Sequence, residues 1–111
     1  MKWALRKSEP ERDKWQLQNL RTSPEVRASL HAEGITFLHI GTGTVLSANR
    51  VGARMWERAS EGLALDAIAA QVSLEFDAPQ ATVRQDADRF LRELMDAGVL
   101  VRQGESLAVL A

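Results

Sequence analysis

Short apolar runs separated by turn residues fill the first half of the chain and predict a small sheet. The runs are VRASLHA (26–32), ITFLHI (35–40) and TVLSA (44–48), each of strand length. Glu33-Gly34 and Gly41-Thr42-Gly43, which lie between them, are typical of hairpin turns. We expect a three-stranded antiparallel meander, with ITFLHI at its centre because this run is apolar on both faces.

Beyond residue 48 the apolar positions recur every three or four residues, which predicts helices. We expect three of them: residues 50–59, residues 65–76, and a third from a cap at Asp77 to about Ala97. Asn49 is placed to cap the first helix, and Gly98 to end the third in a left-handed conformation.

The two ends of the chain are less regular. Residues 1–24 form a polar N-terminal extension, in which residues 9–20 are open to two interpretations, a short helix or a mobile tail. Residues 25–111 form the predicted domain, and its last segment, 99–110, predicts two short strands around a turn at 103–105. A three-stranded antiparallel sheet followed by three helices and a C-terminal hairpin gives an α+β fold that is winged helix-turn-helix-like.

The segment Gly41-Thr42-Gly43 raises the question of a phosphate-binding loop. A dinucleotide fingerprint needs a third glycine three residues beyond the second, opening a helix, but that position is Leu46 in a strand-like run. A Walker loop needs Gly-Lys-Ser or Gly-Lys-Thr, and neither occurs. We therefore interpret these glycines as hairpin residues that supply positive φ.

Composition narrows the function classes. The chain has 111 residues, which suits one domain, and its 14 basic and 15 acidic residues give a net charge of −1. This balance argues against a nucleic-acid or membrane partner. There is no cysteine, which excludes disulfides and thiolate chemistry, and the N-terminus has no apolar run long enough for a signal peptide or membrane span. We expect a soluble, cytoplasmic protein.

Catalytic and metal-binding groups are sparse. The two histidines, His31 and His39, fall in predicted strands without a cluster of further ligands, whereas a metal site needs three or four. No Ser–His–Asp arrangement is indicated. We expect no metal, no cofactor and no enzymatic activity.

The third predicted helix carries an apolar stripe wider than its core face needs. The tight cluster on a helical wheel consists of Val83, Ala87, Phe90, Leu94 and Gly98. Leu91 and Met95 extend this stripe towards Arg84 and Asp88. Two interpretations stay open: Leu91 and Met95 pack under the sheet or the wing, or they form the floor of a groove beside an edge strand at 44–48 that accepts a peptide strand.

The order and spacing of a set of residues resemble the PqqD family over about residues 26–101. The pattern consists of a hairpin glycine, a strand leading into an asparagine, a helix with a tryptophan, and a closing helix that ends in Gly-Val-Leu. The matching positions are Gly43, Asn49, Gly52, Ala53, Trp56, Asp86, Phe90, Leu91, Leu94, Gly98, Val99 and Leu100.

The resemblance implies a non-catalytic peptide chaperone, or RiPP recognition element. Such proteins bind the leader of a ribosomally made precursor peptide and present it to a modifying enzyme, often a radical SAM enzyme or a leader peptidase. The family's leader pairs with the third strand and lies against the third helix. The implied peptide-binding residues are Thr44, Val45, Leu46, Ser47 and Ala48 on the strand, and Arg84, Asp88, Leu91 and Met95 on the helix.

One departure bears on the pathway. Ser47-Ala48 stand where the family often has leucine before the asparagine. A lasso-peptide pathway or another peptide-modification pathway is therefore as compatible with the chain as synthesis of pyrroloquinoline quinone. On this assignment, Leu91→Glu is expected to abolish leader binding and leave the fold intact.

Two further hypotheses concern DNA binding and assembly. A winged helix-turn-helix regulator would use the third helix for recognition, but that helix has mixed charge, whereas phosphate contacts need clustered Lys or Arg. An oligomerising module, such as a homodimer, would use Trp3 and Trp15 of the N-terminal extension.

Overall fold

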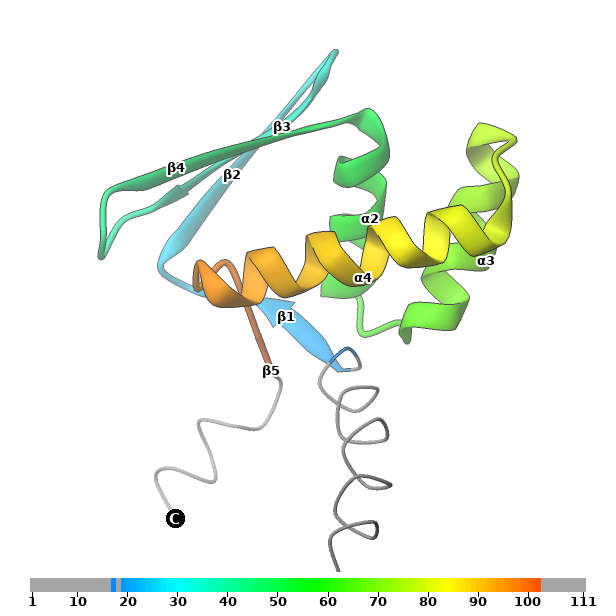
Figure 1. Ribbon diagram of the computed structural model, residues 1–111. Coiled ribbons are helices and arrows are strands. Elements are labelled where there is room, and N and C mark those ends of the chain that lie inside the picture. The colour runs from blue at the N-terminus through cyan, green and yellow to red at the C-terminus, as the bar shows by residue number, and fades with distance from the viewer. Residues whose placement is uncertain (1–16, 18, 103–111) are drawn as a thin grey trace, which may run out of the picture.

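The larger sheet has three antiparallel strands in the order β2-β3-β4. These are β2 (Val26–His31), β3 (Gly34–His39) and β4 (Thr44–Asn49) in a computed structural model that describes residue 17 and residues 19–102. The predicted meander is confirmed, with the ITFLHI strand at its centre. The helices of the chain lie on one side of this sheet, so one sheet face is covered and the other is open (Figure 1).

The covered face follows from the alternation of side chains along β3. Ile35 and Phe37 are fully buried, while Leu38 points to the open face and is exposed. The register pairs Ile35 with Leu30 on β2 and with Ala48 on β4, so these side chains share the inner face.

Helix α2 (Arg50–Ser60) packs against β3 and β4 on the inner face, and α3 (Leu65–Phe76) and α4 (Gln80–Asp96) follow it, with α3 packed against the other two helices. The predicted cap of the first is confirmed, because the backbone N–H of Gly52 donates to Oδ1 of Asn49 at 2.9 Å. The predicted stop of the third is also confirmed. Gly98 has a φ of 79°, and Val99 N donates to Leu94 O as in a Schellman motif.

The predicted cap at Asp77 is wrong. Asp77 lies in the left-handed region, with φ 52° and ψ 51°, where it closes α3. Pro79 occupies the cap position of α4 and makes no side-chain hydrogen bond. The chain must reverse between α3 and α4 within three residues, and aspartate is one of the few non-glycine residues that tolerate this conformation.

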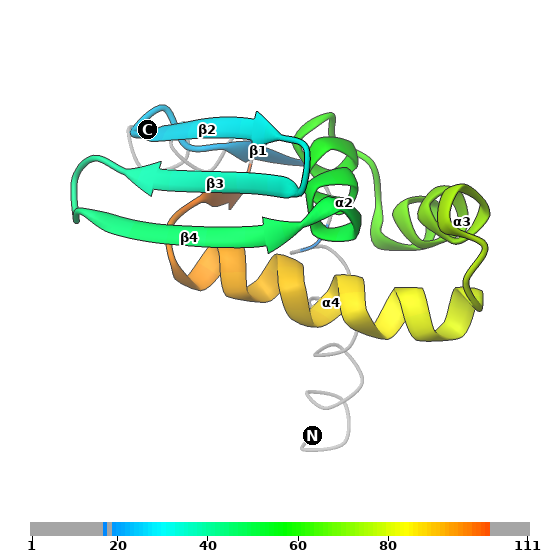
Figure 2. The same ribbon diagram turned by 90° about the horizontal axis from the view of Figure 1, so that it is seen from above.

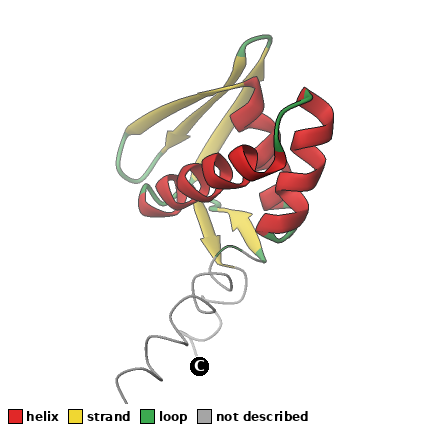
Figure 3. Cartoon of the chain, turned by 45° about the vertical axis from the view of Figure 1, so that its right-hand side comes forward, coloured by secondary structure: helices red, strands yellow, loops and turns green. Residues whose placement is uncertain are grey.

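Two short strands form a second sheet: β1 (Leu20–Thr22), which precedes the larger sheet in the sequence, and β5 (Leu100–Arg102), which follows the helices. This pair lies apart from the larger sheet, on the other side of the helices (Figure 3). The prediction of a local C-terminal hairpin is therefore corrected for β5, whose partner is β1. The return strand expected after residue 103 and most of the helix or tail expected over 9–20 lie outside the described residues.

The buried core extends upstream of the predicted domain boundary at residue 25, and that boundary stays a prediction. Leu17 and Leu20 belong to the buried core, so the packed unit begins upstream of that position. Trp56 of α2 reinforces the connection, because its Nε1 donates to Oγ1 of Thr22 at 2.9 Å while its ring meets Phe37 edge-on at 5.5 Å. The N-terminal strand is thereby tied to both the helices and the larger sheet.

Leu91 lies inside the core. Its side chain is 0% exposed, in the same cluster as Val83, Ala87 and Leu94 of α4. Met95 is half-buried and packs against that cluster. Of the two interpretations of the wide stripe, the structure supports packing for Leu91.

Gly34 is expected to be irreplaceable because of a close approach between strands. A Cβ at this position would lie 1.9 Å from the carbonyl oxygen of Ala48, so Gly34→Ala should lower the free energy of unfolding by about 3 kcal/mol or more. A Cβ at Gly43 meets nothing within 4 Å, and only its φ of 75° is unfavourable, so Gly43→Ala should cost about 1 kcal/mol. Equal losses for the two variants in chemical denaturation would contradict this assignment.

Leu91→Ala is expected to lower the free energy of unfolding by about 2–5 kcal/mol, because it leaves a cavity in the core. Leu91→Glu, expected from the sequence to spare the fold, should instead prevent folding, since it buries an unpaired carboxylate. Asp88→Ala on the neighbouring surface is the control and should change stability by less than about 1 kcal/mol. Urea denaturation followed by circular dichroism measures all three, and a folded Leu91→Glu variant would refute the burial.

Candidate functional site at the free edge of the sheet

Strand β4 forms an open edge of the larger sheet. It pairs with β3 on one side, and no described strand pairs with it on the other. Helix α4 runs alongside this edge without closing it (Figure 2). The outward backbone N–H and C=O groups of β4 are therefore available to another extended chain. The edge strand expected from the sequence is confirmed.

Two adjoining cavities lie between β4 and the helices. The first has a volume of about 340 Å³ and is lined by Phe37, Leu46, Ser47, Phe90, Glu93, Leu94 and Ala97. The second, of about 510 Å³, is lined by Ser47, Ala48, Asn49, Val51, Gly52, Met55, Asp86, Arg89, Phe90 and Glu93. Ser47, Phe90 and Glu93 are common to both. We call the two cavities together the β4–α4 groove.

The groove changes character along its length. Its first cavity is mainly apolar, with Phe37, Leu46 and Leu94 contributing side chains. In the second cavity, Arg89 Nη2 lies 3.1 Å from Oδ1 of Asp86 in an exposed ion pair. Glu93 touches both cavities and forms no ion pair within the described part of the chain. A ligand in this groove would meet an apolar site and an acidic one in succession.

Gly52 allows Phe90 to lie against α2. A Cβ on Gly52 would be 2.9 Å from Cβ of Ala48 and 3.3 Å from Cζ of Phe90. Glycine is therefore required where β4, α2 and α4 converge. The half-buried Phe90 ring is held at the junction of the two cavities, where it can contact a ligand in either.

The strand half of the predicted site lies along the open edge of β4, and its binding of a peptide stays a prediction. Leu46 and Ala48 are half-buried on the inner face, and Leu46 lines the apolar cavity. Thr44, Val45 and Ser47 are exposed. The five positions thus present both an open backbone edge and side chains towards the groove.

The helix half of the predicted site does not line the groove. Leu91 is sealed in the core and Met95 packs against it. Arg84 Nε binds Oδ1 of Asp66 on α3 at 2.7 Å, and Asp88 binds Arg92 at 2.5 Å. None of the four lines either cavity, so the groove floor expected from Leu91 and Met95 is not found there, and contact of these four residues with a peptide stays a prediction.

The error has a geometric cause. An apolar stripe on a helix has two flanks, and at about 100° per residue Asp86, Arg89 and Glu93 lie nearly opposite Arg84, Asp88 and Met95. The sequence pattern alone does not say which flank faces the sheet edge. The position of Phe90 could have indicated the correct flank. It is the large apolar residue of the stripe that lies next to Asp86 and Glu93.

No other chemistry gathers among residues 17 and 19–102. No group of three His, Asp or Glu side chains is placed to hold a metal ion there. His39 Nδ1 accepts from the backbone N–H of Thr42, and His31 Nε2 lies 3.2 Å from Oγ1 of Thr36. Both imidazoles thus have local structural contacts. None of the helices in this part of the chain has the length and apolar character needed to cross a membrane.

The glycine-rich segment is a hairpin turn, as expected, but of its two glycines Gly43 alone supplies the expected positive φ, and Gly41 does not. Gly43 has a φ of 75°, its N–H donates to His39 O at 2.7 Å, and β4 follows it directly. A phosphate-binding loop would open a helix at this point.

Helix α4 offers little to nucleic acid. Its three arginines each have a carboxylate partner among the described residues: Arg84 with Asp66, Arg89 with Asp86, and Arg92 with Asp88. Phosphate binding favours an uncompensated basic stripe, and this helix surface lacks one. The DNA-binding hypothesis therefore gains no support.

Two solved structures similar to this chain are complexes of other proteins with leader peptides. One similar solved structure is TbiB1 in complex with the TbiA(beta) leader peptide, which is 29% identical with a TM-score of 0.64 and aligns over 72% of this chain and 93% of that one. Another is lasso peptide synthetase B1 complexed with the leader peptide, 18% identical with a TM-score of 0.67, over 75% of this chain and 98% of that one, which shows a shared fold. No curated protein sequence matches significantly.

The family match covers the parts that build the groove. The model of the family described as Coenzyme PQQ synthesis protein D (PqqD) matches residues 34–100, from the start of β3 through α4 to the first residue of β5. This range is more than half of the chain. The chain therefore belongs to the PqqD family.

Proposed function

We propose that this protein is a non-catalytic peptide chaperone that binds the leader of a ribosomally made precursor peptide in the β4–α4 groove and presents it to a modifying enzyme. The main structural support for this proposal is the unpaired edge of β4, which lies beside a groove. Membership of the PqqD family and similarity to TbiB1, which was solved with a leader peptide, support the proposal.

The leader adds as a fourth strand along Thr44–Ala48. Backbone hydrogen bonds to β4 supply affinity that depends little on sequence. Because alternate side chains of a strand point to opposite faces, every second leader residue enters the groove. The leader must be extended over this length, and the sheet grows from three strands to four.

Selectivity comes from the helix side of the groove. A large apolar leader residue fits the cavity lined by Leu46, Phe90 and Leu94, where burial of such a side chain contributes about 1.5–3 kcal/mol. The carboxylate of Glu93 favours a basic or hydrogen-bond-donating residue in the adjoining cavity. These contacts replace those first expected from Arg84, Asp88, Leu91 and Met95.

The pathway can make pyrroloquinoline quinone, a lasso peptide or another modified peptide, with a radical SAM enzyme or a leader peptidase as the enzyme partner. The precursor is made on ribosomes and its leader is recognised before modification, so we place this step in the cytoplasm. A homodimer through the N-terminal extension stays a prediction, since Trp3 and Trp15 lie outside the described residues.

Phe90→Ala is expected to weaken binding of the synthetic leader of the cognate precursor by about tenfold or more, because it removes apolar contact worth at least about 1.4 kcal/mol. Met95→Ala, on the opposite flank of α4, is the matched control and should bind the leader as the wild type does. Isothermal titration calorimetry gives both affinities.

Near-ultraviolet circular dichroism first establishes that both variants keep native packing. If Met95→Ala loses leader binding and Phe90→Ala binds the leader as the wild type does, the leader lies on the other flank of α4. A wild-type protein that fails to bind the leader would reject the proposed function itself.

A further inference from the structure

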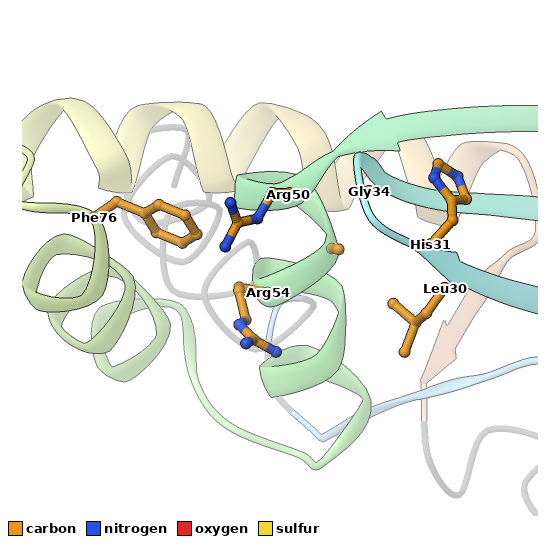
Figure 4. A pocket seen from close by; sticks show the side chains of 7 residues that line it. Leu30, His31, Gly34, Arg50, Arg54 and Phe76 are labelled. Carbon is orange, nitrogen blue, oxygen red and sulfur yellow. The ribbon is translucent and has the colours of Figure 1, made fainter.

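A separate pocket lies at the far end of the sheet from the β3–β4 hairpin. The β2–β3 turn, the start of α2 and the end of α3 enclose it, with a volume of about 210 Å³. Figure 4 shows its lining side chains, of which Leu30, Arg50, Arg54 and Phe76 matter here. We call it the α2–α3 pocket.

The α2–α3 pocket is independent of the β4–α4 groove. The two share no lining residue. On α2, Ala53 and Arg54 face the pocket, whereas Gly52 and Met55 face the groove. At about 100° per residue these pairs lie on opposite sides of the helix. A leader in the groove therefore leaves the pocket open.

The pocket carries an uncompensated positive charge. Arg54 pairs with Glu57 at 2.7 Å and Glu75 at 2.6 Å, and Glu75 also pairs with Arg58 at 3.7 Å, so these two arginines and two carboxylates balance one another. The hydrogen bonds of Arg54 with Glu57 and Glu75 raise the pKa of its guanidinium above the ordinary value. Arg50 is exposed and forms no ion pair with a described carboxylate. No carboxylate lines the pocket, so the guanidinium of Arg50 is left for an external anion.

Two apolar side chains, Leu30 and Phe76, also line the pocket. Leu30 is 58% exposed, although its paired neighbour on the same inner face, Ile35, is 0% exposed. The helix layer thus stops short of β2 and leaves Leu30 uncovered. Across the pocket, the half-buried ring of Phe76 and the guanidinium of Arg50 reach towards each other (Figure 4). A ligand here meets two hydrophobic side chains and one free cation.

We propose that the α2–α3 pocket docks the modifying partner protein through a segment in which a large apolar side chain stands next to an aspartate or glutamate. The apolar side chain lies between Leu30 and Phe76, and the carboxylate pairs with Arg50. The inference rests on the proposed leader function, because it assigns the second contact needed to bring a leader and an enzyme together. Leader and partner then bind at once, on opposite sides of α2.

Probe peptides test the chemistry directly. The ¹⁵N-labelled full chain is titrated, with and without leader, with the capped peptide Gly-Asp-Leu-Phe-Asp-Gly and the matched peptide Gly-Lys-Leu-Phe-Lys-Gly. The acidic probe should shift the amide signals of Leu30, Arg50 and Ala53 in both series, and the basic probe should not. Absence of these shifts at millimolar concentration, or equal shifts from both probes, overturns the proposal.

Variants extend the test to the purified enzyme that modifies the cognate precursor. Arg50→Glu and Leu30→Ser should each weaken enzyme binding by about tenfold, while leader affinity stays within about twofold of wild type. Both should fold, because an acidic residue in the first turn of α2 suits the helix dipole and Leu30 is already exposed. Arg27→Glu is the matched charge reversal on exposed β2, outside the pocket, and should change neither affinity.

The two affinities separate the two proposals. Normal leader binding together with undiminished enzyme binding by Arg50→Glu overturns the docking site and leaves the leader function standing. If neither the wild-type protein nor Phe90→Ala binds the leader, the leader function is rejected. Competition between leader and enzyme for wild-type protein would also overturn the docking site, because it requires both to bind together.

Discussion

The backbone of β4 is hydrogen-bonded on one side only, and the site depends on that asymmetry. An open edge invites pairing with any extended chain, and proteins usually block such edges with charge, proline or a covering element. Here the edge residues 44–48 carry neither charge nor proline, and α4 leaves a groove beside them. The edge is held rigid at both ends, by the Gly43 turn and by the Asn49 cap that starts α2.

The same constraint gives the glycines and aromatics around β4 their roles. Gly34 lets β3 approach the carbonyl of Ala48, which fixes the strand where it enters α2. Gly52 lets Phe90 reach the same junction, so that α4 is set at a distance that leaves cavities beside the strand. Phe37 packs inside the sheet against Trp56 and also lines the groove, which connects the core directly to the binding surface.

Local patterns in the sequence were enough for the three strands, the three helices, the Asn49 cap and the Gly98 stop. The pairing of β1 with β5 was missed because each strand has three residues, too few for alternation, and their partners lie some 80 positions apart in the chain. Asp77 has the side chain of an N-cap, yet the short connection between helices put it in a left-handed turn. The groove-facing flank of α4 was missed because tertiary packing, and not periodicity, decides which side of a stripe meets β4.

The most direct measurement is of nuclear Overhauser effects between a ¹³C-labelled leader and the ¹⁵N-labelled protein in their complex. If the leader pairs with β4, backbone contacts between leader and β4 are expected in a regular two-residue repeat along 44–48, with leader side-chain contacts to Phe90 at alternate positions. Leader contacts confined to another surface, with the outward amides of β4 still exchanging freely with solvent, would contradict this pairing.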